Sequence, residues 1–272
     1  MADGFMLIPA GEFIYGPEIT YERLELVPPP RPRQTMWLEQ FWLAKYPVTY
    51  CQWREFVTDT GHHWPGCWWR IRRGPAGWLR RFAPCAAYPP EMANYPMVDV
   101  TLADALAYCD WLGERLGVTV SLPSEFQWEK AARGVDGRTF PWGEALPRPE
   151  LAGLPATHSP GLAYYWRNLL VRPQPELARS GWYWRVGAPL PVGAVPQNVS
   201  PFGAVDMAGN IWEWTISLYN EADPRFHVVK GGSWGYSPPH TAGNCRSACS
   251  ITIPSVDYHA QGTGFRPIIN EQ

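Results

Sequence analysis

Short apolar runs, each cut by proline or glycine, make up most of this chain. Proline removes a backbone donor and glycine favours turns, so neither suits the interior of a long helix. The 272 residues include 30 prolines, 25 glycines and 16 tryptophans, which fits short strands and long loops packed around large flat side chains. A chain of this length can also bury a full core. We therefore expect an α+β domain with few helices rather than a helical bundle.

Three segments depart from this pattern because each carries the start and stop signals of a helix. Each has a candidate N-cap, a residue three positions later that completes a capping box, and a terminating glycine. These residues are Thr49, Gln52 and Gly61; Thr101, Asp104 and Gly117; and Ser124, Gln127 and Gly134. In the second segment, residues at helical spacing predict one apolar face. They are Leu102, Ala105, Leu106, Cys109 and Leu112 or Leu116.

The remaining apolar runs predict short strands or buried extended loops. They are FMLIPAGEFIYG, MWLEQFWLAKYPV, IWEWTISLY, HVVKGGSW and TGFRPI. Two irregular inserts near 60–96 and 147–191 are rich in proline and tryptophan. We expect them to fold back on a single domain that spans 1–272.

Charge and hydropathy limit the partners of the chain. A net charge of -2 gives no strong attraction to nucleic acid or to anionic membranes. No long apolar run predicts membrane insertion, and the N-terminus lacks the layout of a signal peptide. We expect a soluble cytoplasmic protein for which nucleic acid is an unlikely partner, with surface display by another route left open.

Eight motifs follow one another along most of the chain. They are MLIPAGEFIYG, FWLAKYPVTYCQWREF, YPMVDVTLADALAYCDWLGERLG, SLPSEFQWEKAARG, FPWGE, VGAVPQNVSPFGAVDMAGNIWEWT, VVKGGSW and GFRP. Their order resembles that of the formylglycine-generating enzyme, or sulfatase-modifying factor, family. The resemblance implies a variant of the C-type lectin fold, with a small antiparallel sheet, two main helices and much irregular structure. Function does not follow from the fold.

The family's enzymes, as the resemblance implies, oxidise a sulfatase cysteine with two copper-binding thiols that follow a GGS-aromatic motif. Thiolates suit the soft ion Cu(I). Tyr236 and Thr241 occupy the two positions here, and neither side chain forms a thiolate. Cys245 and Cys249 offer a relocated pair, so a copper-dependent oxidase of this type is the alternative function. Our preferred expectation is that the chain is not an enzyme.

The segment 235–260 has an unusual composition. Its 26 residues include no Trp, Met, Lys, Gln or Glu, the residue types whose codons never end in a pyrimidine. Adenine-directed mutagenesis of AAC or AAT codons leaves such a gap. The chain is similar to the variable proteins of diversity-generating retroelements, conceivably from a thermophilic bacterium such as Thermus. An ordinary polar surface loop is the simpler alternative.

This resemblance predicts a non-catalytic protein that binds an unknown, macromolecular ligand through variable side chains. The expected ligand-contacting residues are Tyr236, Ser237, His240, Thr241, Asn244, Ser250, Thr252, Ser255, Asp257, Tyr258 and His259. A fixed frame is expected around them. Its members are Trp234, Cys245, Arg246, Ala248, Pro254, Gly264, Phe265 and Arg266.

Metal sites are the remaining candidates. DMAGNIWEWT resembles the family's structural calcium segment, in which Asn210 and Glu213 are candidate ligands. A turn role for Asn210 and an ion pair from Glu213 to an arginine form the alternative. His62, His63 and Cys67 could begin a zinc site, but adjacent histidines do not easily face one ion, so we expect a surface turn. Apart from structural calcium, no cofactor is expected.

Two further groups have ordinary structural explanations. Arginines and tryptophans are interleaved in WWRIRRGPAGWLRR. Such a mixture can bind phosphates and stack on bases, but we expect the arginine stems to pack on the tryptophan faces instead. Cys51 and Cys109 lie among apolar residues of predicted helices and are expected to be buried thiols.

Overall fold

The fold is known from a computed structural model. It describes residues 4–16, 32–65, 69–73, 80–84, 92–144, 189–233, 250–254 and 262–270. Within these ranges the chain forms two four-stranded sheets, two two-stranded hairpins and three helices.

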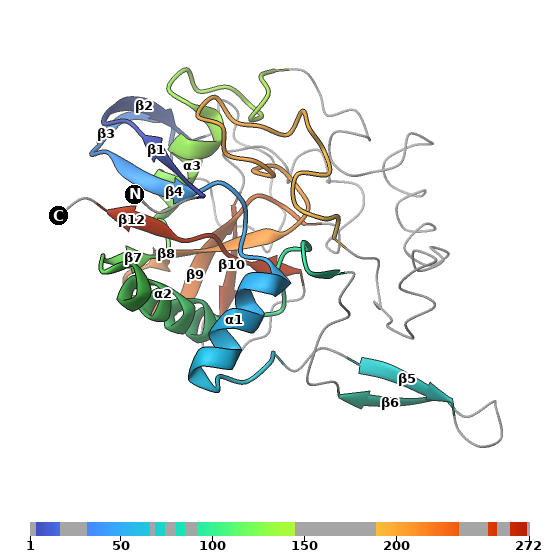
Figure 1. The fold of residues 1–272 in the computed structure, drawn as a ribbon. Coiled ribbons are helices and arrows are strands. Elements are labelled where there is room, and N and C mark those ends of the chain that lie inside the picture. The colour runs from blue at the N-terminus through green and yellow to red at the C-terminus, as the bar shows by residue number, and fades with distance from the viewer. Residues whose placement is uncertain are drawn as a thin grey trace, which may run out of the picture.

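The first four-stranded sheet joins the two ends of the described chain. It is antiparallel throughout, in the order β1-β4-β12-β7. Its strands are β1 (Phe5–Ile8), β4 (Phe41–Ala44), β7 (Val120–Ser121) and β12 (Ile268–Asn270). Because β1 and β12 both pair with β4, the first and last strands lie in the same sheet (Figure 1).

The second four-stranded sheet has the order β10-β9-β8-β11. Its strands are β8 (Trp212–Asn220), β9 (Asp223–Lys230), β10 (Ser250–Pro254) and β11 (Thr263–Gly264). The strands β8, β9 and β10 are antiparallel neighbours, whereas β11 pairs with β8 in parallel. Strands β10 and β11, which follow β9 in the chain, therefore lie at opposite edges of this sheet: β10 beside β9, and β11 beside β8.

Two hairpins complete the described strands. One pairs β2 (Gly11–Tyr15) with β3 (Gln34–Leu38), and the other pairs β5 (Trp69–Arg73) with β6 (Arg80–Pro84). Figure 1 shows the β5–β6 hairpin apart from the two larger sheets.

The three predicted helices are confirmed, together with their caps. They are α1 (Tyr50–Thr60), α2 (Leu102–Leu116) and α3 (Glu125–Arg133). All three begin with the predicted reciprocal capping box, and the predicted glycine follows the last residue of each. None of the described helices is both long enough and apolar enough to cross a membrane.

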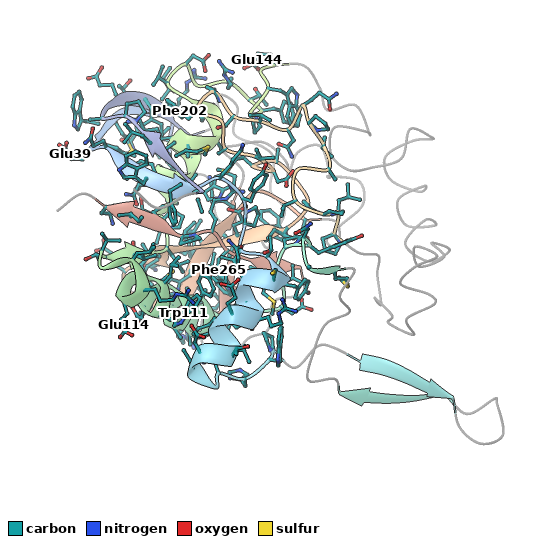
Figure 2. All side chains as sticks on the ribbon, viewed as in Figure 1. Glu39, Trp111, Glu114, Glu144, Phe202 and Phe265 are labelled. Carbon is teal, nitrogen blue, oxygen red and sulfur yellow. The ribbon has the colours of Figure 1, made fainter. Side chains whose placement is uncertain are left out.

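Aromatic side chains from distant segments form the larger core cluster. Trp53 of α1 stacks on Tyr108 of α2, with ring centroids 5.8 Å apart. Phe265 meets both rings edge-on, at centroid distances of 6.1 and 5.3 Å. Figure 2 shows Phe265 deep among the side chains, beside α1. This contact fixes the last part of the chain against both helices.

A second cluster lies around α3 and the first sheet. Trp128 packs there with Phe41 and Leu43, and all three side chains are buried. The apolar face expected on α2 is confirmed, with Leu112 rather than Leu116 as its last member, because Leu116 is 37% exposed. Tyr108 takes a central place in that face.

Candidate functional site

The segment 234–261 is held at both ends by one short loop. The backbone N–H of Gly209 donates to the carbonyl of Gly231, with the N and O atoms 2.6 Å apart. Three residues later, the N–H of Trp212 donates to the carbonyl of Gly262 at 2.9 Å. Residues that precede and follow the segment are therefore fixed close to one another.

The returning end is held by close packing as well. The carboxylate of Asp99 accepts a hydrogen bond from the N–H of Gly262 at 2.8 Å. A Cβ atom on Gly264 would lie 2.1 Å from the carbonyl oxygen of Met97, far inside van der Waals contact. Only glycine fits there, because the opposing atom belongs to the backbone. This confirms the expected fixed role of Gly264.

Arg266 joins the returning end to both four-stranded sheets. Its buried guanidinium donates to both carboxylate oxygens of Glu213, each at 2.7 Å. It also donates to the carbonyls of Ala44, Lys45 and Val205. The indole N–H of Trp128 donates to the same carboxylate at 2.7 Å, so the buried charges are paired and hydrogen-bonded.

The two expected calcium ligands are engaged within the protein. Glu213 pairs with Arg266, and the side-chain amide of Asn210 exchanges two hydrogen bonds with the backbone of Leu190, at 2.8 and 3.1 Å. Asn210 has a φ of 69°, which is typical of the turn role considered from the sequence. The structure thus places both residues in the alternative roles, and calcium binding at them stays a prediction.

Asp206 lies close to this buried pair. Its carboxylate accepts a hydrogen bond from the N–H of Gly193 at 2.7 Å. Burial raises the pKa of Asp206 to about 6, and the nearby Glu213 carboxylate acts in the same direction. The hydrogen bond and the charge of Arg266 oppose this rise. Asp206 was not singled out by its sequence, which has no local sign of its burial.

Most of the expected ligand-contacting residues lie outside the described residues. The exceptions are Ser250 and Thr252, which pair on β10 with Lys230 and Val228 of β9. The residues outside are Tyr236, Ser237, His240, Thr241, Asn244, Ser255, Asp257, Tyr258 and His259. Cys245 and Cys249 lie outside as well. The frame residues Trp234, Cys245, Arg246 and Ala248 also lie outside the described residues, and the contacting residues stay a prediction.

Of the six cysteines, only Cys51 and Cys109 are among the described residues. Cys109 is buried as expected, and burial raises the pKa of its thiol well above the usual range. It is therefore protonated and poorly nucleophilic in the folded protein. Cys51 is only half-buried, so the expectation of a fully buried thiol holds for Cys109 alone.

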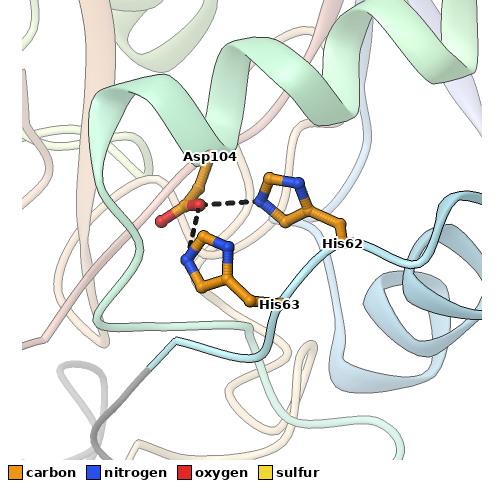
Figure 3. A group of neighbouring side chains, drawn as sticks. All are labelled: His62, His63 and Asp104. Atoms are coloured by element: carbon orange, nitrogen blue, oxygen red, sulfur yellow. Dashed lines mark hydrogen bonds and ion pairs between the residues drawn. The ribbon is translucent and has the colours of Figure 1, made fainter.

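A second group of candidate ligands joins α1 to α2. His62 and His63 follow the C-terminal glycine of α1, and Asp104 lies in the first turn of α2. Both imidazole Nε2 atoms face one carboxylate oxygen, Oδ1 of Asp104, at 2.8 and 3.3 Å (Figure 3). Adjacent histidines were not expected to face one ion easily, yet both rings face one oxygen atom here. Cys67, the third residue considered from the sequence, lies outside the described residues.

Asp104 therefore has two roles, of which the sequence indicated one. Its Oδ2 atom accepts hydrogen bonds from the N–H and the hydroxyl of Thr101, as the capping box requires. Its Oδ1 atom faces the histidines. The hydrogen bonds to His62 and Thr101 lower the pKa of Asp104 despite its burial, so the side chain is a carboxylate at neutral pH.

The arginine-rich segment forms the β5–β6 hairpin. Its register sets Arg72 opposite Arg81 and Arg73 opposite Arg80. Like charges directly across a strand pair disfavour pairing. Nucleic acid as an unlikely partner stays a prediction.

The profile of the FGE-sulfatase family, described as the sulfatase-modifying factor enzyme 1-like domain, matches residues 1–271. The chain belongs to this family. The resemblance drawn from its motifs is thereby confirmed at the level of the family. A retroelement origin and a source in Thermus stay predictions.

Three curated relatives are about 30% identical to the chain over the aligned residues. Hercynine oxygenase of Mycolicibacterium smegmatis is 30% identical over 86% of this chain and 54% of its own length. Inactive C-alpha-formylglycine-generating enzyme 2 of Bos taurus is 33% identical over 73% of this chain and 54% of its own length. Formylglycine-generating enzyme of Mycobacterium tuberculosis is 29% identical over 86% of this chain and 87% of its own length. The chain spans about half the length of the first two relatives.

These relatives correct the expectation that the chain is not an enzyme. Two of the three are named as enzymes, an oxygenase and a formylglycine-generating enzyme. The expectation rested on Tyr236 and Thr241 at the two thiol positions and on the composition of the segment 235–260. The two enzymes among the relatives are named for different activities.

Solved structures confirm the predicted fold. PvdO from Pseudomonas aeruginosa aligns with a TM-score of 0.65 at 20% identity, over 98% of this chain and 94% of its own. Treponema denticola variable protein 1 aligns with a TM-score of 0.58 at 17% identity, over 98% of this chain and 95% of its own. The α+β, C-type lectin-like fold of the formylglycine-generating-enzyme type is thus shown, and similarity at this level carries the fold alone.

Proposed function

We propose that this protein recognises a ligand through variable side chains of the segment 235–260, which a fixed frame displays. The observation that carries the proposal is the fixation of both ends of that segment by residues 209–212. The residues between the frame positions can change without loss of the core, since Phe265 and Arg266 lie outside the segment. Binding sites are commonly built on loops that a rigid scaffold positions.

The composition of the segment supports recognition. Tyrosine, serine, asparagine and glycine occur in it, and antibody paratopes use the same residue types. Tyrosine offers contact area at a low cost in entropy, while the small polar residues form adaptable hydrogen bonds. We propose that the ligand is a macromolecule and that a retroelement diversifies the segment in its host.

Nucleotide sequencing of the gene and its flanks tests this proposal. We expect a nearby near-copy of the 3′ end that differs from the gene mainly where the copy has adenine. The substitutions should fall on codons 235–260. A flank without such a copy, or differences spread evenly along the gene, would refute diversification by a retroelement.

Substitution tests the separation of frame and display. Tyr236→Ala, His240→Ala and Tyr258→Ala should leave the midpoint of thermal unfolding near that of the original protein. Gly264→Ala, in the frame, should lower it. Equal losses of stability in both groups would show that the segment is part of the core.

A second candidate function is oxidation by relocated thiols, which the names of the enzymatic relatives favour. The family's two thiol positions carry Tyr236 and Thr241, so the residues present do not fit copper there. Cys245 and Cys249 would have to bind it instead. Titration of the reduced protein with Cu(I) tests this. We expect the protein to bind one ion. The Cys245→Ser, Cys249→Ser double variant should lose this binding, and Cys51→Ser should keep it. No uptake would eliminate this function.

A further inference from the structure

We propose that His62, His63 and Asp104 form a binding site for one divalent transition-metal ion of the zinc type. The site joins the end of α1 to the start of α2 and lies outside the segment 235–260 (Figure 3). Among the described residues, this is the group of histidines, cysteines and carboxylates whose ligand atoms converge closely enough to hold an ion.

Two of the three distances between the ligand atoms match a bound ion. The two Nε2 atoms lie 2.8 and 3.3 Å from Oδ1 of Asp104, and all three ligand atoms lie within 4.8 Å of one another. Ligands about 2.0–2.1 Å from a zinc ion are roughly 3 Å apart at tetrahedral or octahedral angles. The side chain of His63 is 63% exposed, so its imidazole has room to turn toward a bound ion.

The types of donor select the class of ion. Two imidazole nitrogens and one carboxylate suit zinc and its first-row neighbours, whereas calcium and magnesium prefer oxygen ligands throughout. Three protein ligands with a solvent-exposed side leave coordination positions for water. This is the pattern of an open site rather than of a closed structural one.

The surroundings hold two of the three ligands in place. Thr101 binds Oδ2 of Asp104 through its N–H and its hydroxyl, which leaves Oδ1 directed at the histidines. The ring of His62 packs on Phe56, with centroids 4.8 Å apart, and its backbone N–H donates to the hydroxyl of Thr60. Partners that orient a ligand in this way strengthen metal binding.

Hydrogen bonds alone could also hold this arrangement, since His62 Nε2 lies at hydrogen-bond distance from Oδ1. The two explanations differ in what happens to His63. A hydrogen-bonded cluster needs only His62 and Asp104, and the exposed His63 adds little to it. A metal site needs both imidazoles.

Titration of the full-length, metal-free, reduced protein with Zn²⁺ tests the proposal, with competition against a chromophoric chelator. We expect one ion to bind. His63→Ala should weaken binding roughly tenfold or more, because losing a ligand costs at least as much as losing the partner of a ligand. His158→Ala removes one of the other histidines and should leave the affinity unchanged.

Titration with Co²⁺ identifies the ligands. Nitrogen and oxygen ligands give visible d–d bands without the near-ultraviolet charge-transfer band of cobalt thiolates. His62→Ala should abolish these bands too, and if that variant fails to fold, His63→Ala still decides, because its side chain is exposed. Three results would each overturn the proposal. They are equal zinc affinity in the original protein and His63→Ala, no zinc binding in either, and a cobalt–thiolate band that His63→Ala leaves unchanged.

Discussion

Replacing Arg266 by methionine should destabilise the protein more than any surface change, because it strands a buried carboxylate. The side chains of Arg266 and Glu213 are 0% and 1% exposed, and two hydrogen bonds of 2.7 Å join them. After Arg266→Met, Glu213 keeps only the hydrogen bond from Trp128. Breaking a buried ion pair from one side costs about 3–5 kcal/mol.

We expect a loss near the middle of that range, about 4 kcal/mol, in the free energy of unfolding. For a domain of this size it corresponds to a fall of roughly 10 °C in the unfolding midpoint. Equilibrium unfolding in urea, followed by tryptophan fluorescence and by circular dichroism, gives the free energy. If the slope of the free energy against urea concentration is unchanged for both signals, unfolding is still two-state.

Two further variants separate the stranded charge from lost packing. Adding Glu213→Gln to Arg266→Met removes the charge but keeps an acceptor for Trp128, so it should recover roughly half of the loss. Arg225→Met breaks the exposed pair with Asp223 and should leave the midpoint unchanged. The reasoning fails if Arg266→Met costs no more than Arg225→Met, or if Glu213→Gln recovers nothing.

Three other predictions concern packing, pH and thiol reactivity. Gly264→Ala forces a Cβ against the carbonyl of Met97 and should lower the free energy of unfolding by about 1–3 kcal/mol, measured in urea; an unchanged value would refute the close contact. Burial raises the pKa of Asp206 from 3.8 to about 6. The protonated side chain therefore contributes to stability below pH 3.8, and this contribution is lost as the pH rises through about 6. Relative to Asp206→Asn, the original protein should lose about 2–3 kcal/mol between acidic and mildly alkaline pH, and parallel pH profiles of the two would contradict this. Alkylation of the native protein, followed by mass spectrometry, should modify the half-buried Cys51 well before the buried Cys109, and equal rates would contradict the burial.

The helices were predictable because their signals are local. A capping box joins residues three positions apart, and a glycine in the left-handed region ends α1 and α2 whatever lies around them. Thr49, Thr101 and Ser124 were therefore identified from the sequence as helix starts. The order of motifs predicted the fold. The pairing of the strands could not have been predicted from any single segment.

The candidate sites were only partly predictable, because their members are distant in sequence. Asp104 lies 42 residues from His62, so the sequence showed it as a capping residue and not as a partner of the histidines. Adjacent histidines were not expected to face one ion easily, yet the turn after α1 aims both Nε2 atoms at one oxygen. Glu213 was read as a ligand or an ion-pair partner, and only packing against Arg266 assigned it the second role.

The sequence by itself determined the helices, the family and the unusual composition of 235–260, since each depends on neighbouring residues or on the order of motifs. The tertiary structure decided which polar groups are buried and what they meet. Burial sets the pKa of Asp206, the fit of Gly264 against Met97 and the pairing of Arg266 with Glu213. Each of these depends on the distance between atoms that the chain brings together only when it folds, because desolvation and close packing act through space and not along the sequence.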